Sequence, residues 1–170
     1  STIMYICTST VSAIISYSND DITTTLLESL YYIQHRGQDS YGMVTVNQTG
    51  NVETIKNPGL ISTEDLNGEN SSGSMASIGI GHVRYPTTGS KVMESAQPYS
   101  KRVGPSLLSR RSGYIAREFI MAHNGQVKIK EEMRPHLKDL EVGCRSDSDI
   151  LLNILTQELS YHTTLNEETI

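Results

Sequence analysis

The chain has 170 residues, a net charge of −5, 36% hydrophobic and 19% charged residues, a composition typical of one globular domain. The negative charge disfavours nucleic acid as the main partner, because phosphate binding needs a basic surface. No apolar run has the length of a membrane span, and the two cysteines make neither a disulfide framework nor a zinc site. We therefore expect a cytoplasmic protein with no metal, no cofactor and no membrane contact.

The predicted elements begin with strands. Residues 3–17 are rich in β-branched side chains and predict one long strand or two short ones. A helix is expected over about 22–34, where apolar residues recur at helical spacing after capping residues at 18–21. Further strands are expected where short apolar or β-branched runs occur, at 42–47, 51–56, 77–83 and 119–123.

The second half of the chain adds loops and one more helix. Residues 62–74 are polar and predict a surface loop, and the strands at 42–47 and 51–56 are expected to form a hairpin. Residues 100–118 carry five basic side chains around a Gly-Pro turn. A helix is expected over about 148–160, capped by the preceding Ser and Asp residues, so the pattern indicates an α+β fold.

Four polar segments stand out because they lie at the ends of predicted elements, where binding sites are usually built. Each alone is compatible with an ordinary turn, a helix cap or a surface ion pair. They read Gln-His-Arg-Gly-Gln-Asp-Ser-Tyr-Gly at 34–42, Gly-His-Val-Arg-Tyr-Pro-Thr-Thr-Gly at 81–89, Ala-His-Asn-Gly at 122–125 and Ser-Asp-Ser-Asp at 146–149.

The chemistry of these segments fits a free amino acid. Arg84 stands before a Gly- and Pro-bearing loop, and a guanidinium binds a carboxylate through two parallel hydrogen bonds. The side-chain amide of Asn124 beside the backbone N–H of Gly125 offers two donors to an oxyanion. The carboxylate of Asp147 can bind an ammonium. The combination predicts a pocket that holds an α-amino acid and polarises its side-chain carbonyl.

In order and content the four segments resemble those of the class II glutamine amidotransferases, whose nucleophile is N-terminal (Ntn). Among these they are most similar to the glutaminase domains of the amidophosphoribosyltransferase family, which acts in purine biosynthesis. The resemblance covers roughly 22–160, and matches as long as 81–90 rarely arise by chance. It implies an α+β fold of four layers, the αββα Ntn-hydrolase sandwich. It also implies that 1–170 is a single glutaminase-like domain, with no phosphoribosyltransferase domain present.

The resemblance implies roles for individual residues. Arg84 and Thr87 match the positions that hold the α-carboxylate of glutamine. Asp147 matches the position that binds the α-ammonium. Asn124 and Gly125 match the oxyanion hole of the family.

The nucleophile departs from the family pattern, which is an N-terminal Cys followed by Gly, with the free α-amine of the Cys as general base. Cys7 follows six residues and precedes Thr8, and removal of 1–6 would free its amine. A second alignment places Ser12 at the nucleophile position, where no catalytic mechanism survives. Arg36 falls beside the nucleophile in the family. The structural interpretation of Cys7 is a small apolar core residue.

Two functions follow from these alternatives. The favoured one is a degenerate relative, a pseudoenzyme with impaired or absent glutaminase activity that acts as a binding or scaffold module with a protein partner or in an oligomer. The internal Cys7, the absence of the following Gly and the lack of a recognisable acceptor domain favour it. The other is an active glutaminase that hydrolyses glutamine to glutamate and ammonia for purine synthesis. We expect the basic segment 100–118 to be an exposed loop, with a contact surface for an acidic partner or nucleic acid as the alternative.

Overall fold

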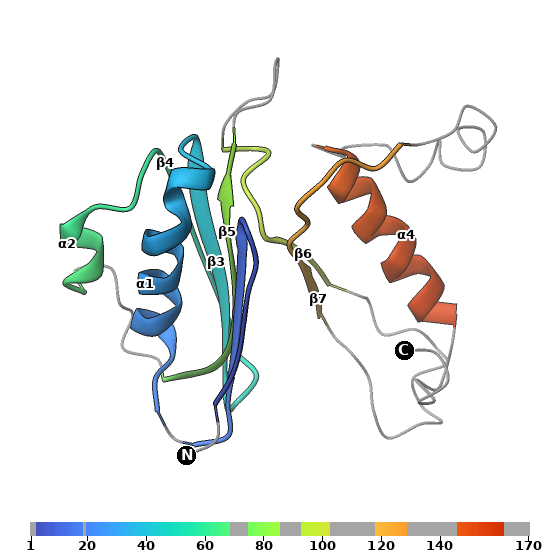
Figure 1. Ribbon diagram of the computed structural model, residues 1–170. Coiled ribbons are helices and arrows are strands. Elements are labelled where there is room, and N and C mark those ends of the chain that lie inside the picture. The colour runs from blue at the N-terminus through green and yellow to red at the C-terminus, as the bar shows by residue number, and fades with distance from the viewer. Residues whose placement is uncertain are drawn as a thin grey trace. The chain divides into compact units, whose positions relative to one another are not determined.

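The computed structural model describes residues 3–18, 20–68, 75–85, 93–102, 118–128 and 146–161. They belong to two compact units (Figure 1). The first unit comprises Ser1–Pro98 with Ala122–Asn124, and the second comprises Tyr99–Met121 with Gly125–Ile170. Each unit combines antiparallel strands with a helix.

Five antiparallel strands form the sheet of the first unit, in the order β1-β2-β5-β3-β4. The segment 3–17 therefore makes two strands, which is one of the two alternatives that the sequence allowed. The predicted hairpin and the strand that follows it are also confirmed. The strands are β1 (Ile3–Cys7), β2 (Val11–Ser16), β3 (Ser40–Asn47), β4 (Val52–Pro58) and β5 (Ala76–Arg84).

The turn between β3 and β4 has the residues that such a turn requires. The side-chain Oδ1 of Asn47 accepts hydrogen bonds from the backbone N of Thr49 at 3.0 Å and of Asn51 at 2.9 Å. Gly50 has a φ of 82°, a conformation that favours glycine. The side chain of one residue thus closes the turn and fixes the register of the hairpin.

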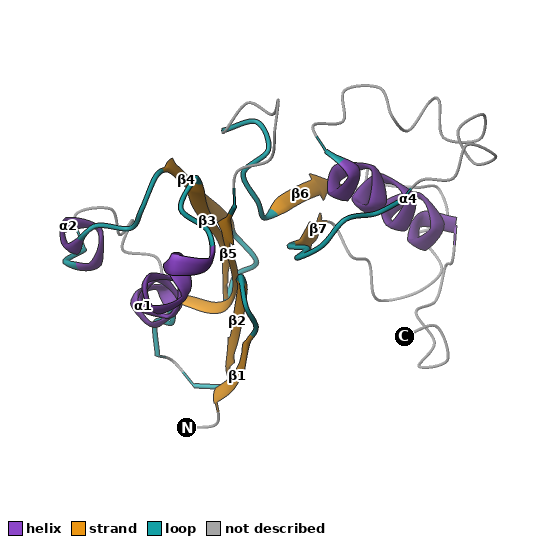
Figure 2. Cartoon of the chain, turned by 45° about the horizontal axis from the view of Figure 1, so that its top comes forward, coloured by secondary structure: helices purple, strands orange, loops and turns teal. Residues whose placement is uncertain are grey.

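Helix α1 (Thr23–Ile33) covers one face of the five-stranded sheet (Figure 2). The carboxylate of Asp21 accepts hydrogen bonds from the backbone N of Thr23 at 3.1 Å and of Ala76 at 3.0 Å, which ties the helix start to the start of β5. The 3-10 helix η1 (Gln34–Arg36) continues the chain from the end of α1. The expected helix over 22–34 is confirmed, and the capping chemistry predicted at 18–21 lies at Asp21.

The core of the first unit lies between α1 and the sheet. Leu26 and Leu30 of the helix are fully buried, as is Ile14 of β2. A Cβ at Gly81 would lie 2.6 Å from a methyl group of Leu30, so glycine in β5 lets the helix approach the sheet closely.

Strand register assigns the site residues to faces of the sheet. Directly opposed residues of an antiparallel pair point to the same face. Gly81 faces α1, so its neighbours His82 and Arg84 point to the opposite face. Ser40 and Gly42 of β3 stand opposite Arg84 and His82 and share that face.

One element was not predicted in the first unit. Residues 62–74 were expected to be a loop, but α2 (Thr63–Leu66) forms one helical turn there. The Ser62 hydroxyl accepts from the backbone N of Asp65 at 3.2 Å, and the Asp65 carboxylate accepts from the backbone N of Ser62 at 2.8 Å. This reciprocal capping box nucleates the turn and was readable in the sequence. Residues 69–74 lie outside the described part of the chain.

The second unit pairs β6 (Tyr99–Arg102) with β7 (Glu118–Met121), and α4 (Asp147–Tyr161) packs against both strands. The helix expected at 148–160 and the strand expected at 119–123 are confirmed with shifts of one or two residues. The β6 strand was missed, because 100–118 was expected to be a loop. The rest of that basic segment, 103–117, lies outside the described residues.

A buried histidine lies in the middle of the sheet. His82 is 5% exposed, and burial together with the charges of Arg84 and His123 lowers its pKa to about 4. The ring is therefore neutral at pH 7, and within the described ranges its Nδ1 has no hydrogen-bond partner.

The lowered pKa of His82 makes the stability of the fold depend on pH. The unfolded histidine takes up a proton near pH 6.5 and the folded one only near pH 4, so stability is complete above the first value and falls between the two. Denaturant unfolding should show His82 contributing a loss of about 2 kcal/mol between about pH 7.5 and about pH 5. His82→Gln should lose less stability than the wild type over this interval, and equal losses would contradict the assignment.

Gly42 is expected to tolerate no side chain. A Cβ there would overlap the backbone carbonyl oxygen of Gln97, which cannot move without its segment. Gly42→Ala should lower the free energy of unfolding by about 1–3 kcal/mol. Gly81→Ala is the matched comparison, since the nearest atoms to its Cβ belong to the Leu30 side chain and not to the backbone, and its loss should be smaller. The reverse order would contradict this packing.

Candidate functional site

The candidate site lies at the end of β5, on the sheet face opposite α1. A Cβ at Gly37 would lie 2.6 Å from the backbone of Val83, so only glycine lets this segment run against the strand end. Asp39, two residues on, donates its backbone N–H to the carbonyl of Arg84 at 3.0 Å. The Asp39 carboxylate is therefore placed at Arg84 by the local fold of the segment 34–39.

Arg84 and Asp39 form an ion pair. Their side chains are 9% and 15% exposed, so the pair is largely withdrawn from water. Removing one partner of such a pair leaves a charge that is buried and uncompensated. The guanidinium expected to bind the carboxylate of a ligand is thus bound to a carboxylate of the protein.

Neutral polar groups surround this pair on the same face. Ser40 stands opposite Arg84 in the register and is fully buried, and its hydroxyl has no hydrogen-bond partner among the described residues. Within the same ranges, the ring Nδ1 of His82, two residues before Arg84, also has no hydrogen-bond partner. Leaving a buried polar atom unpaired costs about 1–3 kcal/mol, and such atoms are few in folded proteins. Among the described residues, this face therefore carries two buried polar groups without a hydrogen-bond partner, in the strands that hold Arg84.

Asn124 is held in place by a residue to which sequence reasoning gave no role. The side-chain amide of Gln97 accepts from the backbone N of His123 at 2.7 Å and donates to the carbonyl of His123 at 3.3 Å. This double contact fixes the residue directly before Asn124. Gln97 lies in the Ala-Gln-Pro sequence at 96–98, outside the four polar segments.

The Asn124 amide contacts the turn between β1 and β2. Its Nδ2 donates to the hydroxyl of Ser9 at 2.5 Å. The turn is itself fixed, because the carbonyl of Thr10 accepts from the backbone N of Val83 at 3.0 Å. Ser9 was missed by sequence reasoning, and a serine in a short turn gives no signal that could have found it.

Cys7 lies on the other face of the sheet from Arg84. It ends β1 opposite Ser12, and the Ser12 hydroxyl accepts from Ser29 of α1 at 2.6 Å. Cys7 therefore shares the α1 face with Ser12, whereas Arg84 belongs to the opposite face. The thiol is exposed, so the expectation of a buried core cysteine was wrong. Ser12 is fully buried in mid-strand, as the second alignment anticipated.

The other predicted site residue of this unit that the structure describes is exposed. Arg36 is the last residue of η1 and points to solvent. Thr87, expected to bind the α-carboxylate with Arg84, lies outside the described residues.

Gly125 and Asp147 belong to the second unit. The Asp147 carboxylate accepts from the backbone N of Val127 at 2.6 Å and of Ser148 at 2.8 Å. It thus joins the first turn of α4 to the segment that follows the Asn-Gly pair. The Ser146 hydroxyl accepts from the backbone N of Asp149 at 3.2 Å and caps the helix as the sequence predicts.

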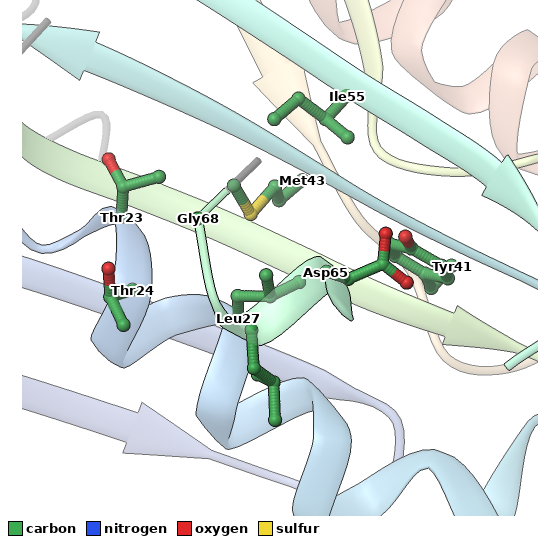
Figure 3. Close-up of a pocket in the computed structure, with 9 residues that line it drawn as sticks. Thr23, Thr24, Leu27, Tyr41, Met43, Ile55, Asp65 and Gly68 are labelled. Atoms are coloured by element: carbon green, nitrogen blue, oxygen red, sulfur yellow. The ribbon is translucent and has the colours of Figure 1, made fainter. Parts of the chain in front are cut away.

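A small pocket on the α1 side of the first unit offers no room for an amino acid. It lies between α1, α2 and the strands β3 and β4, with the Asp65 carboxylate beside the ring of Tyr41 (Figure 3). Burial raises the pKa of Tyr41, and Asp65 adds to the rise. Its volume of about 20 Å³ suits one water molecule.

Two further findings concern the described ranges. None of the helices in them is long and apolar enough to cross a membrane. No group of three or more His, Cys, Asp or Glu side chains within the same ranges could hold a metal ion.

Comparison with known proteins gives one consistent family, although no protein-family model matches the chain. The amidophosphoribosyltransferase of Escherichia coli K12 is 33% identical over 138 residues, which are 81% of this chain and 25% of that protein. The Methanocaldococcus jannaschii amidophosphoribosyltransferase is 32% identical over 151 residues, 88% of this chain and 29% of that protein. The chain therefore spans between a quarter and a third of the length of these relatives.

A solved structure agrees with the sequence relatives. The glutamine phosphoribosylpyrophosphate amidotransferase of B. subtilis, complexed with ADP and GMP, matches with a TM-score of 0.59 and 27% identity. The match covers 85% of this chain and 28% of that one. The antiparallel sheets with their helices thus correspond to the Ntn-hydrolase fold that the sequence implied. The chain is therefore homologous to the amidophosphoribosyltransferases over most of its length, in agreement with a class II glutamine amidotransferase (Ntn glutaminase) domain.

Proposed function

We propose that the chain, as one domain over 1–170, binds glutamine or a related amino acid without hydrolysing it through Cys7. The observation that carries this proposal is the partner of the oxyanion donor: Asn124 bonds to Ser9 and not to the thiol. Cys7 stands on the other face of the sheet from Arg84, and its nitrogen is in a peptide bond with Ile6. An Ntn mechanism needs a thiol and its own free amine at the oxyanion hole.

We propose the amino-acid grip from the residues that match the family pattern. Arg84 would hold the α-carboxylate, with Thr87 beside it, and Asp147 would bind the α-ammonium. Asn124 and Gly125 would donate to the side-chain carbonyl oxygen. Carboxylate recognition by Arg84 is supported by its pairing with a carboxylate in the protein itself.

We further propose that the domain serves as a binding or scaffold module within a larger assembly. The relatives that it matches are about three times as long, so the region that this chain matches works within a larger protein. A domain that binds an amino acid and leaves it intact can signal the amino-acid concentration to a partner, because binding shifts the equilibrium between two conformations of the domain.

An active glutaminase is the second candidate, and the exposure of Cys7 favours it. Removal of 1–6 would free the amine of Cys7. It would also remove most of β1, so the thiol could leave the α1 face. Arg36 would then lie beside the nucleophile, as the family pattern implies.

The two candidates separate in a labelling experiment. We expect the chain to release no glutamate from glutamine and to remain unlabelled at Cys7 by 6-diazo-5-oxo-norleucine, because the thiol lacks a free amine. Intact-mass measurement checks both the start of the chain and the adduct. Cys7→Ala is the control and should behave as the wild type does. A labelled chain that begins at Cys7 would establish the glutaminase instead.

Amino-acid binding has its own test in thermal unfolding. L-glutamine at about 100 times its dissociation constant should stabilise the chain by about 2.7 kcal/mol. Arg84→Gln should abolish the shift, because the ligand carboxylate loses its bidentate partner. Lys128→Gln removes one exposed positive charge and should keep the shift. If neither glutamine nor glutamate changes the unfolding temperature of the wild-type chain, the chain has no amino-acid site and is a structural module.

A further inference from the structure

We propose that the amino-acid site of this chain is occupied by two of its own side chains, and that a ligand binds by displacing them. Asp39 takes the place of the ligand α-carboxylate on Arg84. Ser9 takes the place of the ligand side-chain oxygen on Asn124. This inference rests on the proposed function, because it assigns a regulation to the same site.

The first internal ligand is the Asp39 carboxylate. It belongs to the chemical class that the guanidinium would recognise in an amino acid. Its backbone is anchored on both sides, since its N–H donates to Arg84 at 3.0 Å and its carbonyl accepts from Gly59 at 2.8 Å. The side chain can rotate away from Arg84 while these backbone contacts persist. A ligand can therefore displace the Asp39 side chain from Arg84 without unfolding the backbone around Asp39.

The second internal ligand is the Ser9 hydroxyl. It accepts the hydrogen bond from the Asn124 amide at 2.5 Å. The position of Asn124 is fixed because Gln97 holds the preceding residue, His123. The Asn124 side-chain N–H can therefore donate equally to the Ser9 hydroxyl or to a ligand oxygen at the same place. Asn124 is exposed and Ser9 is half-buried, so this contact can be replaced from solvent.

The two internal ligands are both anchored at the same end of β5. The turn that carries Ser9 is bonded to the strand at Val83, through the carbonyl of Thr10 at 3.0 Å, on the edge that β2 occupies. Asp39 is bonded to the next residue, Arg84, on the edge that β3 occupies. This turn lies at the end of the sheet toward which β5 runs (Figure 1). The last two residues of β5 thus anchor the segments that supply a carboxylate and a neutral oxygen.

A self-occupied site lowers the apparent affinity for a ligand. Only the fraction of molecules in which Asp39 and Ser9 have left can bind, and the observed dissociation constant rises by the inverse of that fraction. Removing an internal ligand should therefore tighten binding, whereas removing an ordinary contact residue would weaken it. The direction of the change distinguishes the two roles.

The test is a calorimetric titration of the full chain with L-glutamine. Asp39→Asn keeps the shape of the side chain and removes its charge, and Ser9→Ala removes the hydroxyl. Each should lower the dissociation constant about tenfold or more. Asp20→Asn is the matched control, because it removes one acidic charge at the other end of the sheet and should leave the dissociation constant unchanged.

A second measurement covers the case in which Asp39→Asn is too unstable to titrate. This substitution removes the Asp39 carboxylate from Arg84, so acetate should raise the melting temperature of Asp39→Asn and leave that of the wild type unchanged. Ser9→Ala changes a turn at the surface and keeps the titration available. Acetate that stabilises both proteins equally would overturn the internal role of Asp39.

The outcomes separate this inference from the proposed function. In one outcome, the wild type binds glutamine while Asp39→Asn and Ser9→Ala both bind it with unchanged or weaker affinity. That result would overturn the self-occupied site and leave the proposed function standing. Failure of glutamine to bind the wild type and both variants would overturn the proposed function, and this inference with it. Tighter binding in the variants supports both.

Discussion

The ion pair between Arg84 and Asp39 is the interaction on which the rest of the site depends. The Arg84 side chain is only 9% exposed and needs a partner, since an unpaired buried charge destabilises a fold by several kcal/mol. Glycine at position 37 makes the pairing possible, because a Cβ there would collide with the end of β5. The backbone bond from Asp39 to Arg84 then fixes the carboxylate. One constraint thus stabilises the strand end and places a carboxylate of the protein on Arg84.

The two faces of the sheet separate Cys7 from Arg84. Arg84, His82 and Ser40 share one face, while Cys7 and Ser12 share the face that α1 covers. A shift of one residue along a strand exchanges the faces, so the register of β1 against β2 separates the thiol from the guanidinium. The turn that follows Cys7 instead carries Ser9 to the side-chain amide of Asn124.

Much of the architecture could be predicted from local sequence. The apolar spacing of Ile22, Leu26 and Leu30 identifies α1, and the Asn and Gly residues at 47–51 identify the hairpin. Helix α2 was missed although its capping pair, Ser62 and Asp65, is visible, because one short turn has no periodicity. The pairing of Asp39 with Arg84 and of Ser9 with Asn124 could not be predicted, since these residues meet only through tertiary contacts across 45 and 115 positions.

The central claim is that the site binds glutamine and leaves its amide bond intact. Nuclear magnetic resonance of glutamine labelled with ¹⁵N in its side-chain amide follows binding and hydrolysis in one sample. The account predicts a change in the amide signal that saturates with protein concentration, with no ¹⁵N-ammonium formed. Ammonium that accumulates with time, and stops on Cys7→Ala, would contradict it.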